Sequence, residues 1–238
     1  MERLQKKIAN SGYTSRRKAE ELIKEGKVKV NDKVITELGF KVNESDKIKI
    51  DDILLEEEQK VYFLLNKPRG VVCTTEDDKK RKTIVSLINT DKRIFPVGRL
   101  DYDTTGLIIL TNDGELSNII TSSKNNIEKT YIAKIKGFLL PNEIMALKKG
   151  LKIDGVKTKK AKVKQKSYDK KADTSIIEIT ITEGKNHQVK KMFEAVGHEV
   201  LKLKRERIAF LTLEGLQSKD YRELSIKEVK KLYSLDKK

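Results

Sequence analysis

The stretch PVGRLDYDTTGLIILTNDG, residues 96–114, decides how the chain is interpreted. Its centre is a short apolar run, GLIILT, bounded by a glycine and by the turn residues NDG, and such a run is typical of a core strand. Arg99 and Asp101 lie in the loop just before it. A loop braced by a buried strand can hold an acid rigidly, as a catalytic group requires. The alternative is an Asp that only caps a turn or pairs with Arg99.

Outward from this stretch, strands and helices alternate without the regular spacing of βαβ units. This irregular order predicts a mixed-sheet α+β domain. A strand, a turn at residues 66–70 and a second strand are expected within 61–75, where two apolar runs flank NKPRG. The other expected strands are 106–111, 131–135, 174–182 and several within 200–213, and the expected helices are 83–88, 115–121, 141–149, 187–196 and 226–235.

The first 59 residues form a separate pattern. Residues 3–9 and 16–25 predict two short helices, the second capped by Thr14 or Ser15. A tight hairpin around Asn31-Asp32 and a strand pair within 46–55 follow. We therefore expect a small domain at 1–59, a polar linker near residues 56–60, and a larger domain at 60–238.

The composition favours a polyanionic partner. The 238 residues carry a formal net charge of +16, and 37% of them are charged. Like charges repel in a compact state, so this excess suggests nucleic acid, and a membrane surface is the weaker alternative. No apolar run is long enough to cross a bilayer, and no signal-peptide pattern opens the chain. One cysteine and two distant histidines predict a reducing cytoplasm and no metal site.

The positive charge is distributed unevenly. Residues 1–59 hold 13 basic and 13 acidic side chains, so the rest of the chain carries the whole excess. Eleven lysines and two aspartates fall within residues 148–171. That run predicts an RNA-facing arm, with a solubilising face as the alternative.

The N-terminal residues RLQKKIANSG and SRRKAEELIKEGKVKVN resemble the S4 RNA-binding domain. The resemblance implies that a basic helix face lies along RNA phosphates, and a solvated helix surface is the alternative. The residues expected to contact RNA are Arg3, Lys6, Arg16, Arg17 and Lys18.

The larger part of the chain resembles the RsuA/RluB family of ribosomal RNA pseudouridine synthases. The motifs that carry this resemblance are GRLDYDTTGLIILTNDG, NKPRGVV, EKTYIAKIKG, EGKNHQVKKMFEAVGHEVLKLKRERI and YREL. It implies an enzyme that needs no cofactor and isomerises uridine, with Asp101 as the nucleophile at ribose C1′ or at uracil C6. A carboxylate is ionised at neutral pH without the help of a base.

The same resemblance implies roles for other residues. Tyr131 would stack on the target base and help to remove the C5 proton, although an aromatic residue in the core would look the same. Lys190 would pair with the aspartate, and Arg99 would fill the space left by a flipped base. Lys67 is expected to contact RNA. His187 has the form of a general base, but an RNA contact or a structural role is preferred for it. Ala209 replaces a glycine that is common in relatives, which affects only a turn.

The resemblance favours a large-subunit (23S) rRNA substrate and a monomer. An RsuA-type enzyme acting on small-subunit (16S) rRNA is the nearest alternative. A protein that binds RNA through the S4 module without catalysis is a second, but it predicts loss of Asp101, Tyr131 or Lys190, and all three are present. A membrane-surface role is the third and weakest alternative, because the sequence contains no amphipathic helix with aromatic residues.

Overall fold

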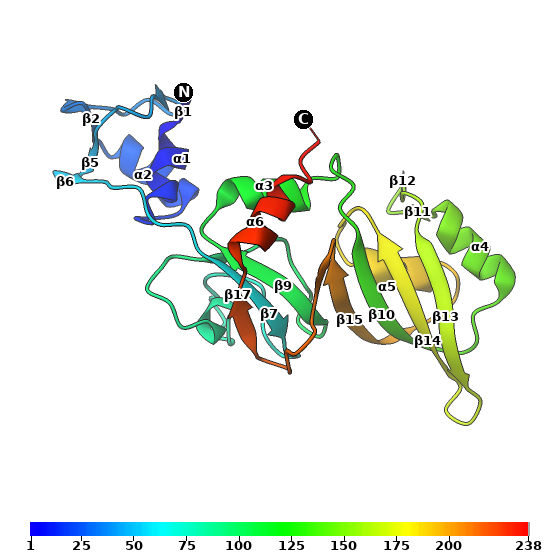
Figure 1. Ribbon diagram of the computed structural model, residues 1–238. Coiled ribbons are helices and arrows are strands. Elements are labelled where there is room, and N and C mark those ends of the chain that lie inside the picture. Colours follow the sequence, from blue (N-terminus) through cyan, green and yellow to red (C-terminus); the bar gives the residue numbers. More distant parts are fainter. Residues whose placement is uncertain (238) are drawn as a thin grey trace. The chain divides into compact units, whose positions relative to one another are not determined.

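The computed structural model describes residues 1–237, which divide into two compact units (Figure 1). The first, here called the N-terminal unit, contains Met1–Val61, Thr90–Ile94 and Asn112–Gly114. The other described residues make up the second, here called the sheet unit. The predicted boundary after residue 59 stays a prediction.

The N-terminal unit packs two helices on a small sheet. Strand β1 (Glu2–Arg3) pairs with β4 (Lys41–Val42), and the helices are α1 (Leu4–Asn10) and α2 (Arg16–Lys24). The second sheet has the order β3 (Lys33–Val34), β2 (Val28–Val30), β5 (Ile48–Ile50), β6 (Ile53–Leu54). The side chain of Ser15 caps α2 by accepting a hydrogen bond from the amide of Lys18 at 3.2 Å. Apolar residues from both layers, including Leu4, Ile23 and Ile50, are fully buried between them.

Both expected hairpins form there for the expected reason. Asn31, Asp32, Asp51 and Asp52 have positive φ values between 47° and 65°, the left-handed region that two-residue hairpin turns require. Asn and Asp tolerate this region better than most residues.

The sheet unit is built on one large mixed sheet. Its strand order is β13-β14-β10-β15-β9-β7-β17, and every neighbouring pair is antiparallel except β15 with β9. The bounds are β7 Tyr62–Lys67, β9 Thr105–Thr111, β10 Lys129–Lys136, β13 Lys162–Asp169, β14 Thr174–Ile181, β15 Val200–Ile208 and β17 Tyr221–Glu223. Short strands β8 (Phe95–Pro96) and β16 (Leu211–Thr212) pair with β9 and β15, and β11 (Lys152–Ile153) pairs with β12 (Val156–Lys157).

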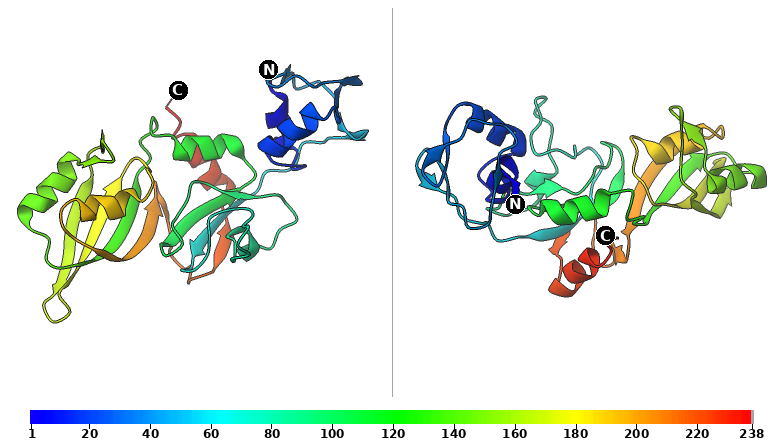
Figure 2. Two further views of the ribbon diagram at one scale, coloured as in Figure 1. Left: turned by 180° about the vertical axis from the view of Figure 1, so that it is seen from behind. Right: turned by 90° about the horizontal axis from the view of Figure 1, so that it is seen from above.

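The helices divide between the two halves of this sheet. Leu64 on β7 and Leu107 and Ile109 on β9 pack into one core cluster with buried residues of α3 (Gly114–Thr121) and α6 (Ile226–Tyr233). In the other half, α5 (Gln188–Glu194) lies behind β10 and β14 in Figure 1 and in front of them in the reverse view of Figure 2. Helix α4 (Pro141–Lys149) lies beside β13.

The two halves meet where β9 runs parallel to β15, and Gly106 makes this contact possible. Gly106 pairs with Arg205, and its φ is 106°. A Cβ at position 106 would overlap the carbonyl oxygen of Arg205. Only glycine therefore fits where the two strands approach each other.

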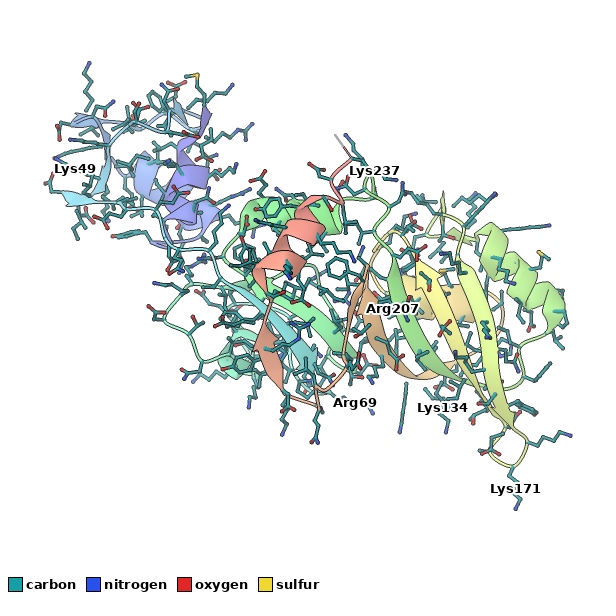
Figure 3. All side chains as sticks on the ribbon, in the orientation of Figure 1. Lys49, Arg69, Lys134, Lys171, Arg207 and Lys237 are labelled. Carbon is teal, nitrogen blue, oxygen red and sulfur yellow. The ribbon has the colours of Figure 1, made fainter. Side chains whose placement is uncertain are left out.

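The predicted α+β class with a mixed sheet is confirmed, and two local predictions are wrong. The expected second strand within residues 71–75 does not form, and only an isolated bridge joins Val72 to Thr83. The RNA-facing arm expected in the lysine-rich run is not an arm, because residues 162–169 form strand β13 of the large sheet. That this run faces RNA stays a prediction. Lys171 lies at the tip of the β13–β14 hairpin (Figure 3).

Candidate active site

A cavity of about 230 Å³ opens in the sheet unit beside the loop that precedes β9. The cavity is lined by residues 97–101 and 104 of that loop, by residues of strands β10 and β15, and by residues 184–190, which lead into α5 and form its first turn. Asp101, Tyr131, Lys190 and Arg99 all lie on its wall. The fold therefore brings together the four predicted catalytic residues from distant parts of the sequence.

The Asp101 loop is held from beneath by Lys67. This lysine is fully buried, and its ammonium donates to the carbonyl oxygens of Asp101 at 3.0 Å, Thr104 at 2.9 Å and Pro68 at 3.2 Å. Burial lowers the pKa of Lys67 from its ordinary value. The prediction that Lys67 contacts RNA is wrong, because its ammonium is enclosed by backbone carbonyl groups and cannot reach a phosphate.

Lys190 joins two carboxylates. Its ammonium lies 3.2 Å from Oδ2 of Asp101, and it is closer to Asp103, at 2.7 Å and 2.9 Å from the two carboxylate oxygens. Helix α5 carries Lys190, so a rigid element holds the cation against the loop. Sequence reasoning found the pair with Asp101 and missed Asp103, which shares the same cation.

The charges of this triad stabilise one another. Burial lowers the pKa of Lys190, but the ion pairs with Asp103 and Asp101 outweigh it and leave the pKa raised. The hydrogen bond from Lys190 in turn lowers the pKa of Asp103. Lys190 therefore stays cationic at neutral pH beside the acid that was predicted to react.

His187 lies next to Asp101 on the other side. Its Nε2 is 3.4 Å from Oδ1 of Asp101, and its side chain is 52% exposed. It occupies the N-cap position of α5 with φ 51°. The residue is thus close enough to both the acid and the solvent to meet a bound RNA, and its RNA contact stays a prediction.

Tyr131 lies on the floor of the cavity and is only 8% exposed. Its hydroxyl oxygen accepts a hydrogen bond from Nη1 of Arg205 at 3.3 Å, and the guanidinium carbon lies 5.9 Å from the ring centre. Arg205 and Lys129 line the same cavity and were not predicted. Lys129 could have been predicted from the sequence KTY, because side chains alternate along a strand and Lys129 and Tyr131 therefore lie on the same face of β10.

Arg99 is exposed where it lines the cavity, and none of the contacts described above involves it. An exposed arginine at the edge of the cavity can change its conformation when RNA binds, as the role predicted for Arg99 needs.

The cations predicted to bind RNA in the N-terminal unit lie on its surface. Arg3, Arg16, Arg17 and Lys18 are exposed, and Lys6 forms an ion pair with Glu2 at 3.2 Å. Arg3 belongs to β1 instead of the first helix, which begins at Leu4. Their contacts with RNA stay predictions.

Residues 1–237 offer neither a cluster of metal-ligating side chains nor a membrane-spanning helix. Within that range, no cluster of His, Cys, Asp and Glu could hold a metal ion. None of the helices formed by these residues is both long and apolar enough to cross a bilayer.

Comparisons with known proteins agree with this geometry. Residues 61–195 match the RNA pseudouridylate synthase family, and residues 2–48 match the S4 domain. The chain is 57% identical to ribosomal large subunit pseudouridine synthase B of Bacillus subtilis over 99% of its own length and 97% of that protein. It is 39% identical to the dual-specificity RNA pseudouridine synthase RluF of Escherichia coli, with 98% of this chain and 79% of the relative covered.

A solved structure also matches over nearly the whole chain. A crystal structure of a pseudouridylate synthase has 35% sequence identity and a TM-score of 0.69, and the match covers 98% of this chain and 100% of the other. The chain belongs to the RNA pseudouridylate synthase family and carries an N-terminal S4 domain. It is an RNA pseudouridine synthase, as the resemblance of its motifs implied.

Proposed function

We propose that this enzyme isomerises a uridine of large-subunit (23S) ribosomal RNA, with Asp101 as its nucleophile. The observation that carries the proposal is the Asp101 carboxylate, 3.2 Å from the Lys190 ammonium in a cavity that Tyr131 also lines. The 57% identity to a ribosomal large subunit synthase supports the choice of substrate.

The reaction rearranges bonds without adding or removing atoms. The bond between ribose C1′ and uracil N1 breaks, a bond between C1′ and C5 forms, C5 loses a proton and N1 gains one. No oxidant or metal is needed for this balance. The Asp101 carboxylate supplies negative charge to the sugar or the base while they are separate, either as a covalent bond at C1′ or C6 or as an ion pair.

Lys190 and Tyr131 support this chemistry in different ways. Lys190 forms an ion pair with the carboxylate and keeps it at the wall of the cavity. Tyr131 offers its ring face to the base and its hydroxyl group to the C5 proton. The target base has to leave its helix to reach the cavity, and Arg99 is placed to take up the vacated space.

RNA is held outside the cavity by exposed cations. We propose that Arg3, Lys6, Arg16, Arg17 and Lys18 bind phosphates through the S4 domain and that His187 touches the RNA near the target. The site is formed by one chain, which supports a monomer, and an rRNA substrate supports action in the cytoplasm.

The first test replaces Asp101 by Ala, and by the isosteric Asn. Both full-length variants should lose pseudouridine formation by about 10³-fold or more, because the nucleophile is gone. Their melting temperatures and their affinity for an rRNA transcript should stay close to the wild type. Turnover is followed by the release of tritium from C5 of the target uridine, because uridine and pseudouridine have the same mass.

The control for this test is Asp78→Ala, which removes an exposed acid of the same unit that does not line the cavity. It should react at the wild-type rate. Near-normal turnover by either Asp101 variant would overturn the assignment. Parallel reactions on 23S and 16S transcripts distinguish the large-subunit proposal from the small-subunit alternative.

A further inference from the structure

Two buried cations on the floor of the cavity are not used by the function described above. Lys129 opens strand β10 and Arg205 lies on the neighbouring strand β15. Lys129 is 7% exposed and Arg205 is 3% exposed. Both line the cavity that holds Asp101, and Arg205 is the direct strand partner of Tyr131.

Neither cation has an anionic partner within residues 1–237. The Lys129 ammonium has only a long contact to the carbonyl oxygen of Ile127, at 3.5 Å. Arg205 donates through Nε to the carbonyl oxygen of Leu107 at 2.7 Å and through Nη1 to Tyr131. Its Nη2 is buried and makes no hydrogen bond. Asp101 and Asp103 form their ion pairs with Lys190, and no ion pair joins either acid to Lys129 or Arg205 among the described residues.

Such an arrangement is costly in the absence of a ligand. An unpaired buried charge is unfavourable, and so is a buried N–H without an acceptor. The effect is visible in the pKa of Lys129, which burial and then the charge of Arg205 lower to about 8. The cavity therefore contains two cationic donors that lack an anionic partner and that an electron-rich ligand would complete.

We propose that Lys129 and Arg205 bind a carbonyl oxygen of the target uracil and stabilise the negative charge that the base acquires. This inference rests on the proposed function. When the C1′–N1 bond breaks, its electron pair stays on the ring and spreads over N1, O2 and O4. Asp101 balances the charge on the sugar, and the two cations balance the charge on the base. Lys129 and Arg205 offer only donors, and a carbonyl oxygen only accepts.

The test combines a change in the base with a change in the protein. Transcripts carry tritium at C5 of the target nucleotide, as uridine, 2-thiouridine or 4-thiouridine, and the single-turnover rate of tritium release is measured. Sulfur is a weaker acceptor than oxygen. For the wild type, one of the two thio substitutions should slow release by about 10- to 100-fold, the value of a hydrogen bond to a charged group.

Lys129→Met should lower the rate on uridine by a similar factor, and the sensitive thio substitution should then have little further effect. This non-additivity is the signature of a direct interaction. Lys129→Arg and Arg205→Lys, which keep the charge, should recover part of the rate. RNA affinity should stay within about twofold in each variant, because the phosphate contacts are elsewhere.

Lys134→Met is the matched control. Lys134 lies on the same strand, and the register of β10 places it on the opposite face from Lys129 and Tyr131. This variant should show the wild-type rate and the full thio effect.

Two results would overturn the proposal. One is equal reactivity of both thio substrates and uridine with the wild type, which requires no variant to fold. The other is a thio effect of the same size in Lys129→Met as in the wild type. Failure of the proposed function looks different, because the wild type would then release no tritium from any of the three transcripts.

Discussion

At the scale of single residues, the site depends on how a few charges share a small space. Lys190 contacts both Asp101 and Asp103, whereas Lys129 and Arg205 have no acid among the described residues. Asp101 is therefore held beside one cation and faces a cavity whose floor carries two more. In the mechanism that we propose, this asymmetry separates a region near the carboxylate, where the bond to C1′ breaks, from a region for the uracil carbonyl oxygens.

The pKa of Lys129 gives a pH prediction at this scale. Burial and Arg205 lower that pKa to about 8, so the ammonium is lost as the pH rises above about 8. We expect the single-turnover rate to fall above this pH. In Lys129→Arg the fall should move to higher pH, because a guanidinium stays charged.

Other titratable groups around the cavity could also make the rate fall at high pH, so the pH–rate profile of Lys129→Arg serves as the reference. Tyr131 lies on the same strand, Asp101 on the facing loop, Lys185 and His187 on the segment leading into α5, and Lys190 on α5 itself. The pH–rate profiles of the wild type and Lys129→Arg should be measured on one transcript. Identical alkaline limbs would assign the fall to one of these other groups.

At the scale of elements, sequence patterns identified most helices and strands because their signals are local. The Pro at the start and the Gly after the end of residues 141–149 place α4 correctly. The prediction of a second strand within 71–75 was wrong because apolar residues alone do not provide a strand to pair with. Asp103 and Arg205 were missed for a related reason, since their roles depend on contacts far away in the sequence.

Helix α6 provides a stability prediction at this scale. Its capping box joins Ser225 and Glu228, and Arg222 donates two hydrogen bonds to the Glu228 carboxylate. The hydrogen bond from Arg222 is the largest cause that lowers the pKa of Glu228, to about 2. A depressed carboxylate pKa stabilises the folded state above the ordinary pKa, and this contribution disappears as the pH falls through the folded value.

Glu228→Gln should therefore lower the free energy of unfolding by about 2 kcal/mol at pH 7. The difference from the wild type should shrink between about pH 4.5 and pH 2, where the wild-type carboxyl group is protonated. Chemical denaturation over this range measures it. Lys227→Gln on the same helix is the control, and a difference that does not depend on pH would contradict the explanation.

At the scale of the whole molecule, charge is expected to govern affinity and the cavity to govern chemistry. The N-terminal unit matches the S4 domain and exposes Arg16 and Arg17 at the start of α2. The net charge of +16 adds a general attraction for RNA. The sequence alone predicts the role of charge in RNA affinity, because composition and basic patterns do not depend on tertiary contacts.

The corresponding prediction concerns salt. The logarithm of RNA affinity should fall linearly with the logarithm of salt concentration, and Arg16→Gln with Arg17→Gln should reduce the slope by about 0.7–0.9 for each phosphate that is no longer neutralised. The single-turnover rate at saturating RNA should hardly change. Lys170→Gln with Lys171→Gln, at the β13–β14 hairpin, is the charge-matched control. An unchanged slope would count against phosphate binding through the S4 domain.

Gly106 has a consequence for how related sequences are classified. Asp101, Tyr131 and Lys190 can be matched from a sequence alone, but they meet only if β9 and β15 lie side by side. A relative that keeps all three residues and has a larger residue at this glycine would carry the chemical signature without the geometry that makes it work. A position with no functional group of its own can thus help to separate active members of the family from inactive ones.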